Sequence, residues 1–103
     1  DFENVKMLIS VNESVKLIKF ETYYKFRDYV PIEQIYTFIN RMNSAYIFSR
    51  FSLTEDKPNF LIADYYLTYN DCILISQFIY SIEMFAQSVI AATDSCNEDD
   101  LLV

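Results

Sequence analysis

The sequence predicts a single α+β domain in which an antiparallel sheet of about four strands carries its helices on one face. Three observations predict this fold. Two pairs of strand-like segments occur, each pair has a short polar connection, and a segment with apolar residues at helical spacing follows each pair. Short connections make neighbouring strands antiparallel. The 103 residues, 52% of them hydrophobic, suffice for one domain with a core but not for two. We therefore expect the order ββαββα within residues 1–93.

The first predicted hairpin occupies residues 5–27. Residues 5–11 alternate between apolar and polar side chains, which predicts a strand with one buried face made of Val5, Met7, Ile9 and Val11. A polar turn follows at residues 12–14, and residues 15–27 are rich in the β-branched and aromatic residues of a second, longer strand. The buried face of that second strand is expected to contain Ile18, Phe20, Thr22, Tyr24 and Phe26.

The first predicted helix begins at Pro31, whose missing N–H costs nothing in a first helical turn. Apolar residues lie on one side of this segment and polar residues on the other, so an amphipathic helix of about three turns is expected. Asn43 and Ser44 are expected to end it. The apolar side is made of Ile32, Ile35, Phe38, Ile39 and Met42.

The second predicted hairpin joins a strand at 45–53 to a strand at 60–69 through the polar loop 54–59. Asn70 is a favourable N-cap for a long final helix at 71–92. Residues 94–103 are expected to be an acidic, disordered C-terminal tail. The apolar face of the fourth strand contains Leu61, Ala63, Tyr65, Leu67 and Tyr69.

The composition excludes several classes of function. The chain has no Gly, which excludes the glycine-rich phosphate loops, and no His, the commonest general base and metal ligand. The net charge of -7 opposes binding to nucleic acids, whose recognition needs clustered basic residues. The polar residues in 73–92 argue against membrane insertion. We therefore expect no cofactor, no metal site, no nucleic-acid partner and no catalysis.

The two cysteines are expected to be unpaired. Cys72 lies at the start of the final predicted helix and Cys96 beyond its end, roughly 33 Å away, whereas a disulfide needs Cα atoms within about 7 Å. Free thiols fit a reducing compartment. Because the chain begins with Asp1 and not with Met, we expect it to be trimmed or processed, with any targeting peptide outside the given sequence.

Apolar residues exceed what one buried sheet face needs. The apolar arc of the final helix spans roughly 180°, wider than the arc of about 100° expected of a surface helix. We expect part of that arc to pair two copies of the chain about a two-fold axis, through Ile75, Ile79, Ala86 and Ile90. The sheet face away from the helices is also unusually apolar, which favours a partner surface made of Leu17, Tyr23, Tyr46, Phe48, Phe60, Ile62 and Tyr66.

Two carboxylates, Glu21 and Asp64, fall on predicted strands and are the one feature that could suggest catalysis. Without a histidine or a metal cluster beside them, we expect them to be ion-paired, with Lys19 or Arg50 as partners.

Residues 31–92 resemble the YbjN-type family of proposed bacterial sensory-transduction regulators. The resemblance lies in a helix that ends in the Asn-rich segment 40–43, a strand with Phe48, Arg50 and Phe51, an acidic loop, a strand that contains Asp64, and a long apolar helix. It implies an α+β domain similar to type III secretion chaperones, often dimeric, without established catalytic residues, in the bacterial cytoplasm. Family members usually have a Gly at the turn where this chain has residues 69–71, and an extra N-terminal helix.

The leading prediction is therefore a non-catalytic module that binds a client or regulatory protein through apolar sheet and helix surfaces. Two alternatives stay open. One is a dedicated secretion chaperone that holds an extended segment of its client. The other, from a different class, is a sensor whose aromatic residues line a pocket for a small ligand.

Overall fold

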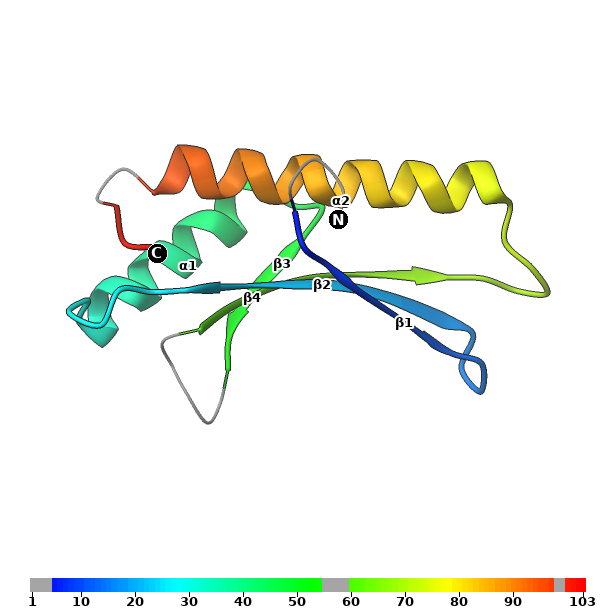
Figure 1. Ribbon diagram of the computed structural model, residues 1–103, viewed down its shortest axis with the longest axis horizontal. Coiled ribbons are helices and arrows are strands. Elements are labelled where there is room, and N and C mark those ends of the chain that lie inside the picture. Colours follow the sequence, from blue (N-terminus) through cyan, green and yellow to red (C-terminus); the bar gives the residue numbers. More distant parts are fainter. Residues whose placement is uncertain (1–4, 55–59, 98–99) are drawn as a thin grey trace.

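A four-stranded antiparallel sheet forms one layer of the molecule, and two helices lie on one side of it (Figure 1). The structure is a computed structural model that describes residues 5–54, 60–97 and 100–103. The strands are ordered β1-β2-β4-β3, so β2 and β4 are central. The elements are β1 (Leu8–Asn12), β2 (Leu17–Lys25), α1 (Ile32–Ala45), β3 (Arg50–Leu53), β4 (Phe60–Thr68) and α2 (Ile75–Cys96). The predicted ββαββα order and the antiparallel sheet are confirmed.

The two central strands pair along their whole length, from Leu17 opposite Thr68 to Lys25 opposite Phe60. Directly opposite residues of an antiparallel pair share a face of the sheet. The face toward the helices therefore receives the predicted apolar residues of both strands. From β2 these are Ile18, Phe20, Thr22 and Tyr24, and opposite them on β4 are Leu67, Tyr65, Ala63 and Leu61.

Aromatic rings join the sheet to both helices. Phe20 is completely buried, and its ring lies 5.8 Å from that of Phe78 and 6.2 Å from that of Phe85, both on α2. Phe26, also buried, meets Phe38 of α1 edge-on at 5.5 Å. The predicted buried side of α1 is correct except at its first residue, Ile32, which is exposed.

The first strand differs from its prediction. Val5 is buried and Met7 half-buried, but these residues precede β1, and the predicted inward-facing Ile9 and Val11 are exposed. The physical reason is the position of β1 in the sheet. β1 is an edge strand, and the aromatic side chains of α2 pack on the neighbouring strand β2.

The third strand is shorter than expected because the chain between α1 and β3 packs against α2. α1 continues to Ala45, and β3 begins only at Arg50. Between them, the hydroxyl of Tyr46 bonds the carbonyl oxygen of Ala91 and the hydroxyl of Ser95 in α2. Tyr46 therefore lies on the helix side of the sheet.

The last helix begins later than expected, and Asn70 is not its N-cap. Leu74 occupies the N-cap position without a side-chain hydrogen bond, and the helix runs to Cys96. Because a helix lies roughly 10 Å from the sheet it covers, the chain needs about three extended residues to cross between the layers. Residues 71–74 make that crossing (Figure 1), and Ile73 packs against the core on the way. Both cysteines are free, Cys72 exposed and Cys96 buried.

The described part of the C-terminal segment is not a loose tail, which corrects the prediction for residues 94–103. Residues up to Cys96 belong to α2, and Leu101 and Leu102 are buried in the core. Leu102 forms a β-bridge with Phe26, and the N–H of Val103 donates to the carbonyl of Lys25 at 2.8 Å. The end of the chain is thus held to the domain by the buried side chains of Leu101 and Leu102, although the residues before them are acidic. Residues 98–99 lie outside the described part of the chain.

The side chain of Asn43 links α1 to β3 through two hydrogen bonds. Its side-chain oxygen accepts from the N–H of Phe51 at 3.0 Å, and its amide donates to the carbonyl of Phe51 at 2.9 Å. We expect Asn43→Ala to lower the free energy of unfolding by about 1–3 kcal/mol, because both backbone groups of partly buried β3 lose their partner. Urea denaturation measures this loss. Asn40→Ala, which changes an exposed residue of the same helix, is the control, and an equal effect of the two would contradict the role of Asn43.

Candidate protein-binding surface

The sheet face away from the helices, here called the outer face, has an ionic centre. Glu21 of β2 lies directly opposite Asp64 of β4, and Asp64 lies opposite Arg50 of β3. Arg50 holds Asp64 with two hydrogen bonds, from Nε at 3.1 Å and from a terminal nitrogen at 2.9 Å. Lys19 forms an ion pair with Glu21 at 3.0 Å. The sequence-predicted carboxylates therefore come together, each with a cation.

The cations of this centre face solvent more than the carboxylates do. The Arg50 side chain is 65% exposed, whereas that of Asp64 is 4% exposed. The same order holds for the second pair, in which the Lys19 side chain is more exposed than that of Glu21. The centre of the outer face thus presents its positive charges to solvent, although the chain as a whole carries -7.

Tyr66 lies between the two cations. The ammonium of Lys19 lies 5.7 Å from the centroid of its ring, and the guanidinium carbon of Arg50 lies 5.6 Å from it. Both distances are within the range of a cation–π attraction. Ion pairs and ring together therefore hold long, flexible side chains in fixed positions.

The two cations of this centre keep their charge across the neutral pH range, because their pKa values are raised. The hydrogen bond to Glu21 raises the pKa of Lys19, and the hydrogen bonds to Asp64 raise the pKa of Arg50. Burial, and then the charge of Glu21, raise the pKa of Tyr23. A group whose pKa is raised on folding stabilises the fold below its unfolded-state pKa, about 10.4 for lysine, and this contribution disappears as the pH rises through the folded-state value.

Apolar and aromatic side chains surround the ionic centre. Leu8, Tyr23 and Tyr66 are exposed, and Leu17, Phe60 and Ile62 are half-buried. The pairing places these residues on one face. The structure therefore brings together five of the predicted partner-binding residues, Leu17, Tyr23, Phe60, Ile62 and Tyr66.

Tyr46 and Phe48, the other two residues predicted for this surface, lie elsewhere. They precede β3, and Phe48 stacks on the inward-facing Tyr65 at 4.3 Å. Both belong to the helix side of the sheet, so they leave the predicted surface. The strand alternation used to place them does not apply, because the chain at these positions is not a strand.

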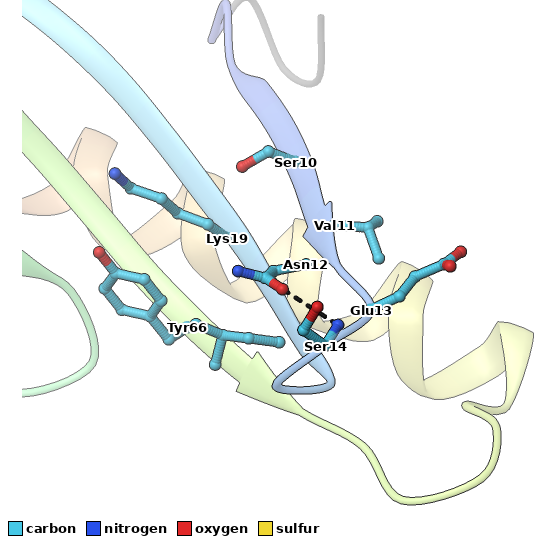
Figure 2. A pocket seen from close by; sticks show the side chains of 8 residues that line it. Ser10, Val11, Asn12, Glu13, Ser14, Lys19 and Tyr66 are labelled. Atoms are coloured by element: carbon cyan, nitrogen blue, oxygen red, sulfur yellow. Dashed lines mark hydrogen bonds between the residues drawn. The ribbon is translucent and has the colours of Figure 1, made fainter.

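Two open hollows border the β1–β2 hairpin on the outer face. The larger measures about 680 Å³, and its lining includes Lys19, Tyr66 and the small polar residues of the hairpin. Figure 2 shows Lys19 and Tyr66 on adjacent strands along one side, with Ser10 and Asn12 along the other. The oxygen of Asn12 also accepts from the N–H of Ser14 at 3.1 Å, which shapes the turn. The smaller hollow, about 250 Å³, is lined by Lys6, Met7, Leu8, Glu21 and Tyr23.

The predicted self-association stripe on α2 is divided. Ile75 is 77% exposed and Ile79 is also exposed, whereas Ile90 is half-buried and Ala86 is completely buried. Ala86 therefore cannot meet a second copy, because its own chain already covers it. The segment before β1 rises from the sheet to α2 (Figure 1). The free part of the stripe is the beginning of the helix.

The described residues contain neither a metal-site cluster nor a helix suited to span a membrane. Within 5–54, 60–97 and 100–103, no three side chains of His, Cys, Asp or Glu come together as a metal site would require. None of the described helices combines the length and apolar character that a membrane span needs.

The fold has a known counterpart. No family model and no curated protein matches the sequence. Among solved structures, the chain superposes on YbjN from E. coli, a proposed transcription regulator, with a TM-score of 0.75, over 100% of this chain and 76% of that one. The chain has the YbjN fold. Sequence identity is 14%, so the likeness to YbjN concerns the fold, and at that level the resemblance found in residues 31–92 is confirmed.

Proposed function

We propose that this chain is a non-catalytic regulatory adaptor that binds a segment of a client protein across the outer face of its sheet. The observation that carries the proposal is the composition of that face. Exposed Tyr23 and Tyr66 flank a centre in which buried Asp64 holds Arg50 in place and half-buried Glu21 holds Lys19. No described helix covers it (Figure 1).

The energetics of such a face favour a protein partner. Tyrosine and arginine are enriched among the residues that contribute most to protein interfaces, because large rigid groups lose little entropy on binding. The ion pairs of Arg50 and Lys19 already hold these side chains, so little further ordering is needed. A client segment with apolar side chains for the rim and a carboxylate near Arg50 would match this face.

The YbjN fold supports a regulatory role without DNA contact. YbjN is described as a proposed transcription regulator. A domain with a net charge of -7 is repelled by the phosphate backbone. If this chain takes part in regulation, it would therefore act by binding a protein rather than DNA. A dedicated secretion chaperone would use the same surface and differ in its client, an unfolded secreted segment.

A small-ligand sensor has less support. The larger hollow has a volume typical of ligand sites, but it lies open at the hairpin and a single aromatic residue, Tyr66, lines it. The inward-facing aromatic residues Phe20 and Tyr65 of the central strands stack on one another beneath the helices and line neither hollow. A surface for a macromolecule therefore accounts better for the outer face.

Photo-crosslinking tests the proposal. A photoreactive phenylalanine analogue at Tyr66 should give one dominant adduct of defined mass in the native cell, because this position lies inside the interface. The same analogue at Tyr36, which is 55% exposed on α1, is the matched control and should not give that adduct. Equal adducts at both positions, or none at Tyr66, would contradict client binding at the outer face.

A further inference from the structure

β1 is an unprotected sheet edge. Among the described residues it has one neighbouring strand, β2, so the backbone groups of its other edge have no strand partner. All five residues of β1 are exposed. Proteins usually protect such edges with charged residues or proline, because a free edge pairs readily with another chain. Residues 8–12 contain no charged residue and no proline, although the chain has 8 basic and 15 acidic residues.

The beginning of α2 faces the same edge. Successive helical residues are rotated by about 100°, so the flank with Ile75 and Ile79 lies opposite the flank with Ser88 and Ser95. Ser88 bonds Ser49, which immediately precedes β3, and so the Ser88 flank faces the β3 edge. The flank of Ile75 and Ile79 therefore faces the β1 edge.

Apolar residues of β1 and α2 thus border one open strip. Ile9 and Val11 lie on the helix side of the sheet, since they are opposite the inward-facing Phe20 and Ile18. They are exposed, as are Ile75 and Ile79. The strip, defined by these four residues, is not covered by any described part of the chain.

From these observations we infer that a second copy of the chain covers the strip, by pairing its β1 antiparallel to the first β1 about a two-fold axis through Ser10. In this pairing, side chains of the two strands that lie opposite each other must point to the same face of the joined sheet. A shift of one residue would exchange the faces, so opposite residues must have numbers that are both odd or both even. Centring on Ser10 pairs all five residues. Ile9 then lies opposite Val11 of the partner subunit, and the two sheets join into one of eight strands.

The charges at the ends of β1 fit this register. Lys6 precedes the strand and Glu13 follows it, and both are exposed. In an antiparallel pair centred on Ser10, the Lys6 end of one copy meets the Glu13 end of the other, twice by symmetry. Opposite charges near each other favour this pairing, whereas a parallel arrangement would bring like charges together. A second copy therefore fits better than an arbitrary strand.

Ser10→Glu tests the inference. Within one copy, the new carboxylate lies opposite Lys19, a favourable cross-strand neighbour, so the fold should persist. In the dimer, two such carboxylates meet on the axis, which should raise the dimer dissociation constant roughly tenfold or more. Sedimentation equilibrium measures the constant. The matched control is Thr68→Glu, an exposed position on the outer face of β4, which should leave the constant unchanged.

A cysteine trap provides an independent readout. In a Cys72→Ser background, Ser10→Cys should form an intermolecular disulfide on mild oxidation. Directly opposite Cα atoms of an antiparallel pair lie about 4.5–5.5 Å apart, which is within the range of about 4.4–6.8 Å that a disulfide spans. Thr68→Cys in the same background should form no intermolecular disulfide, because this position lies away from the β1 edge. A wild-type mass that remains at 12.2 kDa throughout the concentration series would overturn the inference. So would a dimer that neither Ser10→Glu weakens nor Ser10→Cys traps, because its interface would lie elsewhere.

Discussion

Phe20→Ala should lower the free energy of unfolding by about 3–5 kcal/mol, the range for removing a buried aromatic ring. Phe20 is completely buried on the central strand β2 and packs against Tyr65 of the sheet and Phe78 and Phe85 of α2. The change leaves a cavity where the two layers meet. Since small domains have a total stability of about 5–15 kcal/mol, the loss is a large fraction of it.

Urea denaturation followed by circular dichroism measures this loss. Tyr29→Ala is the control, because Tyr29 is 73% exposed and its removal should cost little. If Phe20→Ala does not fold, Phe20→Leu provides the graded alternative, with an expected loss between those of the other two variants. A loss no greater than that of Tyr29→Ala would show that the layers do not meet at Phe20.

Arg50→Ala should lower the free energy of unfolding by about 1–3 kcal/mol. The change leaves the carboxylate of Asp64 without its bidentate partner in a buried position. Breaking a fully buried pair costs about 3–5 kcal/mol, but Arg50 is largely exposed, so water can replace part of what it supplies. The expected effect is therefore smaller than that of the core substitution.

A second variant separates charge from packing. In the double variant Arg50→Ala with Asp64→Asn, no unpaired carboxylate remains, so stability should recover in part compared with Arg50→Ala alone. Thermal or urea denaturation of the single and double variants gives the comparison. A double variant less stable than the single one would mean that Asp64 stabilises the sheet independently of Arg50.

The sequence predicts a strand correctly where its apolar and polar residues alternate regularly and where it has a neighbouring strand on each side. β2 and β4 are central strands with regular alternation, and their inward-facing residues are correctly predicted. Alternation places Ile9 and Val11 on the correct face, but they are not buried as predicted, because burial there depends on which strand lies at the edge. Strand order is a property of the whole sheet, and no local pattern encodes it.

The candidate site was predictable in part for the same reason. Residues on central strands, such as Tyr23 and Tyr66, fall on the outer face as alternation requires. Phe48 does not, because the chain before β3 turns to pack against Tyr65 and α2. The edge of β1, which has no strand partner among the described residues, was not predicted. One local signal exists, the absence of charge in residues 8–12 of a strongly acidic chain.

Mapping a bound client onto the sheet tests the proposed adaptor role most directly. Once photo-crosslinking has identified a partner, its binding segment can be titrated into the isotope-labelled chain and followed by amide chemical shifts. Binding across the outer face should perturb β2, β3 and β4 around Tyr23, Arg50 and Tyr66, while α1 changes little. Tyr66→Arg should weaken the complex while preserving the fold. Perturbations confined to α1 or to β1, or binding unaffected by Tyr66→Arg, would contradict client binding at the outer face.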